Sequence, residues 1–141
     1  MQTCAVVPAV QRDRLRECAE LLSGEHDFRS FMGTRKGLTE DLVTRRHLDI
    51  ELRPGATCVD APHLQFWDIV FSSKGFLYRQ VRRTVAVLVA VAQGRLSLED
   101  VQHLLDVPSK DSWNPRAATA PPHGLYLQHV VYDPADLAEG E

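Results

Sequence analysis

The chain has 141 residues, of which 44% are apolar and 25% are charged, and its formal net charge is −3. These values suit one globular domain over residues 1–141 and exclude a disordered chain. The longest apolar run, Val85–Ala92, is far shorter than the ~20 residues that a membrane-spanning helix needs, so we expect no membrane partner.

The first predicted element is an amphipathic helix over residues 11–22, because its apolar residues recur at three- and four-residue steps. Its apolar face consists of Leu15, Cys18, Ala19 and Leu22. Residues 25–40 show no clear period and are expected to form an ordered loop. The two phenylalanines of this polar loop, Phe28 and Phe31, need burial against the sheet or a partner surface.

Two strands are predicted next. Residues 43–53 alternate apolar and polar side chains, which indicates a half-buried strand that stops at Arg53-Pro54-Gly55. Residues 64–72 carry aromatic and β-branched side chains on both faces, which is typical of a central strand.

A long helix is expected from about Phe76 to Gln93, with Gly94 as the residue that follows its end. Its predicted core stripe is Leu77, Val81, Thr84, Val85, Leu88 and Val91. Its opposite or flanking face is Arg79, Arg82, Arg83 and Ala86.

The remaining elements complete the fold. Ser97 and Asp100 have the spacing of a capping box, which predicts a second helix through Leu105. Residues 108–123 are expected to be irregular, and residues 124–132 to form a third strand. This order predicts an α+β fold with a mostly antiparallel sheet and helices packed on one face.

The cysteines and histidines argue against a metal site. Cys4, Cys18 and Cys58 are an odd number with no Cys-x-x-Cys pair, and the six histidines are never paired at metal-ligand spacing. We therefore expect no disulfide framework and no metal, in a reducing intracellular compartment. The first residues also lack the basic and apolar stretches of a secretory signal.

Basic charge is concentrated in the first part of the chain. Residues 1–83 carry 13 Lys and Arg against 11 Asp and Glu, whereas residues 84–141 carry 3 against 8. Arg79, Arg82 and Arg83 fall in the first two turns of the long helix, where the helix dipole disfavours cations. They form either a solvated helix face or a site for an anion, such as a carboxylate or RNA phosphates.

Four segments match a known set of motifs in the same order. They are Glu-His-Asp-Phe-Arg-Ser-Phe at 25–31, a strand at 44–54, Phe-Leu-Tyr-Arg-Gln-Val-Arg-Arg at 76–83 and Pro-His-Gly-Leu-Tyr-Leu at 122–127. Together they resemble the TruA family of tRNA pseudouridine synthases over roughly residues 10–133. The sequence of the helix at 76–83 is most similar to that of the eukaryotic tRNA pseudouridine synthase-like branch.

The resemblance implies the C-terminal half of such an enzyme. In the family the nucleophilic aspartate lies in an upstream Gly-Arg-Thr-Asp segment, which this sequence does not contain, so we expect the chain to be inactive alone. The family's reaction detaches uracil from its ribose and rejoins it through carbon, without a cofactor, on a base taken out of the RNA stack. The implied partners are tRNA, the N-terminal half of the same protein and, as an open question, a second copy in a homodimer.

The motif positions also imply residue roles. Arg82 is expected to pair with the nucleophilic aspartate, which must be ionised in a partly dry pocket. Leu125 is expected to help wall the base pocket, and Phe76 to pack beneath the strand–helix junction, with a purely core role as its alternative. The candidate RNA contacts are His26, Arg29, Arg35, Lys36, Arg79 and Arg83. For His26 the alternative is a local hydrogen bond, and for the arginines of the 29–36 loop it is solvation.

Two functions other than an enzyme half stay open. One is a non-catalytic RNA-binding or dimerisation module derived from the family. The other is a structural α+β domain whose basic helix start binds an acidic protein partner.

Overall fold

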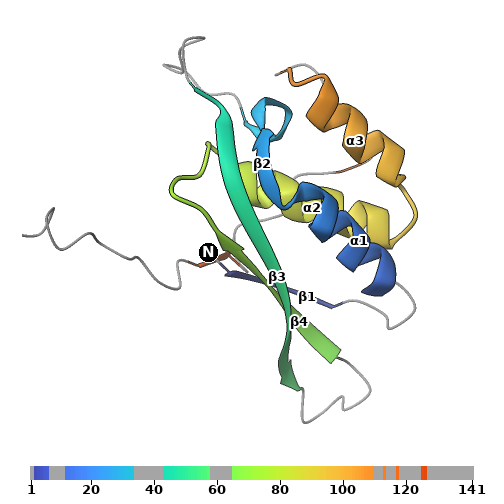
Figure 1. Ribbon diagram of the computed structural model, residues 1–141. Helices are drawn as coiled ribbons and strands as arrows, with labels where there is room; N and C mark the ends of the chain where they lie inside the picture. The colour runs from blue at the N-terminus through green and yellow to red at the C-terminus, as the bar shows by residue number, and fades with distance from the viewer. Residues whose placement is uncertain are drawn as a thin grey trace, which may run out of the picture.

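Figure 1 shows the chain as a computed structural model. The structure describes residues 2–6, 12–33, 43–57, 65–109, 113, 117, 125 and 126. In chain order its elements are β1 (Gln2–Val6), α1 (Arg12–Leu22), β2 (Gly24–Asp27), the 3₁₀ helix η2 (Arg29–Phe31), β3 (Arg45–Thr57), β4 (Gln65–Ser72), α2 (Gln80–Ala92), α3 (Leu98–Asp106) and β5 (Leu125–Tyr126).

The described strands form one sheet in the order β2-β3-β4-β1-β5, and each pair of neighbours is antiparallel. The central strand is β4, in which Phe71 pairs with Ile50 of β3 and Ile69 pairs with Thr3 of β1. The predicted α+β class, the antiparallel sheet and the central position of the strand at 64–72 are therefore confirmed.

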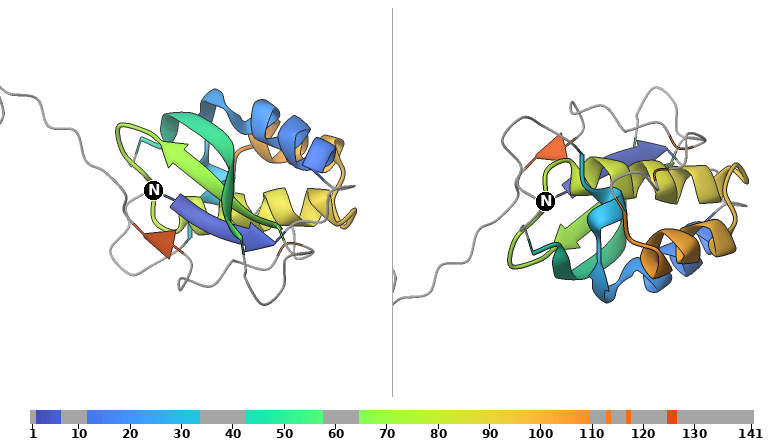
Figure 2. Two further views of the ribbon diagram at one scale, coloured as in Figure 1. Left: turned by 90° about the horizontal axis from the view of Figure 1, so that it is seen from below. Right: turned by 90° about the horizontal axis from the view of Figure 1, so that it is seen from above.

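The described helices lie on one side of this sheet (Figure 2). Apolar side chains of β3 and β4 join those of α1 and α2 in a single buried cluster. Leu48, Ile69 and Phe71 of the sheet are at most 1% exposed, and the predicted apolar face of α1 is buried throughout. Both loop phenylalanines, Phe28 and Phe31, are fully buried in the same cluster, as their placement in a polar segment required.

Two strands differ from the sequence prediction. β1 was not predicted, yet it lies between β4 and β5. The loop expected over 25–40 is wrong for its first part, because β2 pairs with β3 and η2 follows it. In both cases pairing with a distant strand supplies the backbone hydrogen bonds, which a local sequence pattern does not reveal.

β3 also continues past the stop predicted at Arg53-Pro54-Gly55. Pro54 pairs with Trp67 and Thr57 pairs with Gln65, and the register shifts between these two pairs. A bulge at this point accommodates a proline and a glycine within a strand, since neither needs to make a regular ladder bond there.

Helix α2 begins at Gln80, four residues later than the predicted Phe76. Its predicted core stripe is buried in full, but Ala86, which was assigned to the opposite or flanking face, is only 5% exposed. The correction follows from the packing of α2, which is covered by neighbours on most of its surface rather than along one stripe.

The glycine predicted to follow α2 and the capping box predicted to begin α3 are confirmed. Gly94 adopts a left-handed backbone with φ 78° just after α2. Ser97 and Asp100 form the capping box of α3, with hydrogen bonds of 3.1 Å and 2.9 Å between each side chain and the other's backbone N–H. Most of the irregular segment at 108–123 and of the strand at 124–132 lies outside the described residues. Within the part of the chain that the structure describes, no helix is long and apolar enough to cross a membrane.

Candidate functional site

The connection between β4 and α2 places the arginines singled out from the sequence. Ser73 Oγ donates to Gly75 O at 3.0 Å and closes the bend after β4. The fully buried Gln80 accepts the Leu77 N–H with its Oε1 at 2.8 Å, while its own backbone N–H donates to Leu77 O at 3.0 Å. These bonds hold a tight turn directly before the first turn of α2.

Arg79 occupies the N-cap position of α2 in a left-handed conformation, with φ 59° and ψ 11°. A non-glycine residue seldom adopts this backbone, and such positions recur at functional sites. Gly33 makes room for it, because a Cβ at that glycine would lie 2.8 Å from Arg79 Cδ. The Gly33 N–H also donates to Tyr78 O at 2.8 Å, and the Arg79 guanidinium lies over the Tyr78 ring, 5.0 Å from its centroid.

Arg82 and Arg83 follow three and four residues after Arg79, so the three positions share one side of the helix start. Arg82 and Arg83 are partly exposed, and Arg79 is exposed. Burial lowers the pKa of the Arg83 guanidinium, and the nearby positive charge of Arg79 lowers it further. The helix start therefore concentrates positive charge that its own dipole does not offset.

The polar side chains of the His-Asp-Phe segment form hydrogen bonds that stabilise the local backbone. Asp27 Oδ1 accepts hydrogen bonds from Thr44 Oγ1 at 2.6 Å and from the Arg29 N–H at 3.1 Å, which ties η2 to the residue before β3. His26 Nε2 donates to Ser23 O at 3.1 Å, and its ring meets Phe28 edge-on at 5.6 Å. The two polar side chains of this motif are thus engaged within the domain.

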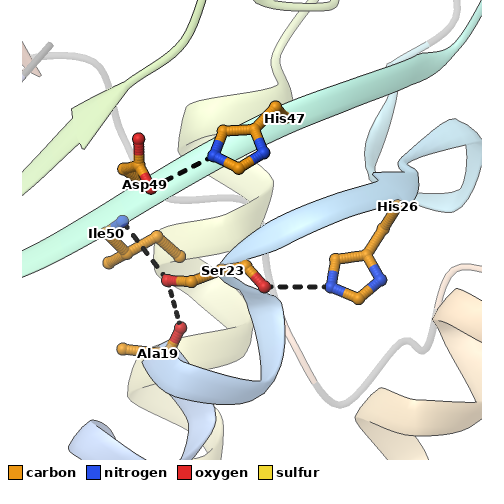
Figure 3. A network of polar contacts seen from close by, with 6 residues as sticks. All are labelled: Ala19, Ser23, His26, His47, Asp49 and Ile50. Atoms are coloured by element: carbon orange, nitrogen blue, oxygen red, sulfur yellow. Dashed lines mark hydrogen bonds and ion pairs between the residues drawn. The ribbon is translucent and has the colours of Figure 1, made fainter.

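Figure 3 shows how Ser23 joins α1 to the sheet beside His26. The Ser23 hydroxyl donates to Ala19 O at 2.7 Å and accepts the Ile50 N–H at 3.3 Å. His47 and Asp49, drawn in the same view, pair at 3.3 Å on exposed positions of β3. The His26 ring points toward the Ser23 carbonyl at the end of α1, in line with the local role considered for it.

The exposed charged side chains of β3 have partners on β3 or on β2. Arg53 pairs with Glu51 within β3, Arg45 pairs with Glu25 of β2, and His47 Nε2 lies 3.3 Å from Asp49 Oδ1. The bidentate hydrogen bond from Arg53 lowers the pKa of the Glu51 carboxyl. Because Asp49 and Glu51 on β3 and Glu25 on β2 lie beside Arg45 and Arg53, the exposed side of this strand has no excess of positive charge for a polyanion.

Two further basic residues lie at the same end of the sheet as the α2 start, and the sequence analysis did not single them out. Arg46, at the beginning of β3, has its Nε 4.0 Å from the position of a Cβ on Gly75, and its Nη1 donates to Val43 O at 2.7 Å. Lys74 is exposed in the bend that follows β4. The Arg-Arg pair at the start of a predicted strand was the available signal, but the strand pairing was needed to place it.

The other predicted site residues are placed only in part. Phe76 is partly buried and packs against the hydrophobic cluster. Leu125 pairs with Thr3 of β1 through its backbone. Arg35 and Lys36 lie outside the described residues. Burial raises the pKa of the Cys18 thiol to about 12, so it stays protonated at neutral pH and is no candidate nucleophile.

The described residues contain no group of three or more His, Cys, Asp or Glu side chains that could hold a metal ion. What the geometry offers is a cluster of guanidinium groups around a rigid turn. Such groups bind carboxylates and phosphates through charge-assisted hydrogen bonds.

Comparison with known proteins decides the family. A family profile described as tRNA pseudouridine synthase matches residues 18–133, which include all four motif segments. The chain belongs to this tRNA pseudouridine synthase family. Its relatives include tRNA pseudouridine synthase-like 1 of Mus musculus, 39% identical over 123 residues, and of Homo sapiens, 36% identical over 135 residues. The tRNA pseudouridine synthase A of Roseobacter denitrificans is 35% identical over 119 residues.

The family relatives are longer than this chain. The matches cover 84%, 92% and 84% of the chain but 42%, 44% and 42% of the mouse, human and Roseobacter proteins, respectively. The chain therefore spans less than half the length of these relatives, as a C-terminal half of the family would.

Proposed function

We propose that the chain is the C-terminal domain of a tRNA pseudouridine synthase, which isomerises uridine to pseudouridine in tRNA, and that it is inactive alone. The observation that carries the proposal is the start of α2, where Arg79, Arg82 and Arg83 share one side of a rigid turn inside the segment that matches the family. The share of the relatives that the chain spans supports a partial enzyme.

In this proposal Arg82 is the catalytic residue. Its guanidinium pairs with a nucleophilic aspartate that belongs to the N-terminal half of the enzyme, outside the part of the relatives that this chain covers. A neighbouring guanidinium holds the pKa of an aspartate down, so the carboxylate stays ionised even where the closed pocket has expelled water. The backbone of Arg82 lies in the first turn of a helix whose start is held by hydrogen bonds, so the point from which this side chain extends is fixed.

Apart from Arg82, we assign the residues of this chain a binding and shielding role. The bond between uracil N1 and ribose C1′ breaks with its electron pair going to N1, the base rotates, and C5 bonds to C1′; C5 then loses its proton and N1 gains one, so the product is an isomer of the substrate. Leu125 would wall the pocket that holds the rotating base, and Phe76 would support the strand–helix junction from below. The residues proposed to contact RNA phosphates are His26, Arg29, Arg35, Lys36, Arg79 and, at the same end of the sheet, Arg46 and Lys74.

A chimera tests the catalytic role. In it, this chain replaces the matching part of Roseobacter tRNA pseudouridine synthase A, and turnover is followed as tritium release from tRNA labelled at uridine C5. Arg82→Ala should lower turnover by about 100-fold or more, the scale expected when a charge-stabilising group is removed, and should change tRNA affinity by less than about threefold. Arg95→Ala, three residues after the end of α2, is the matched control and should leave both unchanged.

The outcomes separate the proposal from its alternatives. Turnover by the isolated chain would contradict the requirement for a second part. Equal losses of turnover and affinity in Arg82→Ala would reduce Arg82 to a phosphate contact. A chimera that binds tRNA normally but releases no tritium would favour a non-catalytic RNA-binding module. An intracellular location is proposed on the cysteine pattern, and homodimerisation on the resemblance. Analytical ultracentrifugation tests the latter.

A further inference from the structure

Arg83 differs from its two neighbours in how its guanidinium is engaged. Its Nη1 donates to the backbone carbonyls of Met32, at 3.0 Å, and Ser30, at 3.4 Å. The same guanidinium lies over the ring of Trp113, 4.6 Å from its centroid. One side chain of α2 therefore joins η2 and the residue that follows it to an aromatic ring located after α3.

Trp113 and Ser109 are anchored to η2 independently of Arg83. The Trp113 ring packs edge-on against Phe31 at 6.4 Å, and Phe31 packs against Phe28 at 5.7 Å. The Ser109 N–H donates to the Oγ of the fully buried Ser30 at 3.1 Å. Trp113, whose ring lies beneath the Arg83 guanidinium, is thus held by its packing against Phe31 and by the nearby hydrogen bond between Ser109 and Ser30.

The position of η2 in turn determines the turn before α2. Gly33 directly follows Met32, whose carbonyl Arg83 holds, and the Gly33 N–H donates to Tyr78 O at 2.8 Å. The stem of Arg79 lies over Gly33. A displacement of Met32 would therefore move the surface on which the left-handed Arg79 rests.

The electrostatics of Arg83 fit an internal role. Among the described residues no carboxylate forms an ion pair with it, and its hydrogen bonds go to backbone carbonyls. Its buried Nε has no hydrogen-bond partner among them, a cost that these bonds and the Trp113 contact offset. Free carbonyls at the end of a helical turn carry partial negative charge, so those of Ser30 and Met32 offset the cation. The lowered pKa of Arg83 reflects this partial burial and the neighbouring charge of Arg79.

We propose that Arg83 is a positioning residue, not an RNA contact: it clasps η2 and Trp113 to α2 and thereby holds Arg79 and Arg82 in place for the tRNA. The part that concerns tRNA rests on the proposed function. The clasp, which consists of the contacts of Arg83 with Ser30, Met32 and Trp113, lies within the domain and can be tested without RNA.

The test compares Arg83→Lys with Arg83→Met in the full chain, after circular dichroism has shown that each variant is folded. Lysine keeps the charge but lacks the planar guanidinium that stacks on an indole while its Nη1 donates to two carbonyls. We expect both variants to raise the hydrogen-exchange rate of the Gly33 amide by about tenfold or more, the size expected from losing a charge-assisted hydrogen bond. Trp113→Leu should have the same effect, and Arg95→Met, as control, should have none.

A second readout is tRNA affinity as a function of salt. Both Arg83 variants should weaken binding to a similar extent, while the slope of log affinity against log salt stays within about 0.5 of wild type, because each lost phosphate contact would change it by ~0.7 to 0.9. Recovery of affinity by lysine, together with a smaller slope in Arg83→Met, would overturn the proposal in favour of a phosphate contact.

The two proposals fail differently. If Gly33 exchange is unchanged in Arg83→Lys, Arg83→Met and Trp113→Leu, the clasp is refuted whatever the RNA binding shows. If the wild-type chain and chimera bind no tRNA, the proposed function is refuted, and Gly33 exchange alone decides whether the clasp exists. If Arg83→Met does not fold, the comparison of Arg83→Lys with Trp113→Leu decides it instead.

Discussion

Gly33 has no side chain at the place where the stem of Arg79 passes. A Cβ there would lie 2.8 Å from Arg79 Cδ and 3.2 Å from its Cβ and Cγ, all closer than ordinary contact. The left-handed backbone of Arg79 fixes the direction of this stem, so the stem has little freedom to move aside. We predict that Gly33→Ala destabilises the chain by about 1–3 kcal/mol, the usual cost of overpacking, measured by urea denaturation.

Two comparisons check the cause of this loss. Gly75→Ala introduces the same methyl group where the nearest atom, Arg46 Nε, is 4.0 Å away, and it should change the free energy of unfolding by less than about 0.5 kcal/mol. Adding Arg79→Ala to Gly33→Ala should recover part of the lost stability, because it removes the crowded stem. Simple additivity of the two substitutions would show that the clash is not the reason.

At the scale of single residues, the sequence predicted where unusual charge would sit but not what each charge would do. Arg79, Arg82 and Arg83, which the helix dipole marks as unusual in the sequence, lie together at the start of α2, with Arg79 at its N-cap. The helix dipole alone does not distinguish their roles. It could not separate Arg83 from the others, because its partners, Ser30 and Met32, are more than 50 residues away in the chain. Side-chain roles that depend on such long-range contacts can be assigned only when the fold is known.

At the scale of elements, α3 is a short helix whose start is stabilised by its own side chains. Ser97 Oγ accepts the Asp100 N–H, and the Asp100 carboxylate accepts the Ser97 N–H. We predict that Ser97→Ala lowers the free energy of unfolding by about 1 kcal/mol, since it leaves a helix N–H without its cap. Ser72→Ala, at an exposed strand position, is the control, and thermal or urea unfolding of both variants gives the comparison.

Elements with self-contained patterns were the predictable ones. The apolar face of α1 and the capping box of α3 depend on residues three or four apart, which the sequence shows directly. β1 and β2 depend on partners in β4 and β3, and neither carries a strong pattern of its own. Helix α2 starts late because Arg79 has a left-handed backbone conformation, which cannot be predicted from an arginine in the sequence.

At the scale of the whole molecule, basic residues from separate segments belong to one end of the sheet, where Figure 1 places the start of β3, the end of β4 and the start of α2. Arg46 lies at the start of β3, Lys74 in the bend after β4, and Arg79 and Arg82 at the start of α2. The exposed charges along β3 are largely paired, either within β3 or with Glu25 of β2, so among the described residues positive charge is concentrated at this end in spite of a net charge of −3. Local potential rather than net charge determines where a polyanion docks.

This distribution predicts which substitutions change the salt dependence of tRNA binding. Arg46→Ala and Lys74→Ala should each reduce the slope of log affinity against log salt by ~0.7 to 0.9, because each removes one phosphate contact and the counterion release that accompanies it. Arg95→Ala removes the same charge after the end of α2, about 20 Å along the helix from Arg79, and should leave the slope unchanged. Filter binding across a salt series measures all three. Equal slope changes for the three variants would mean that tRNA responds to net charge, and the basic end would then not be its binding site.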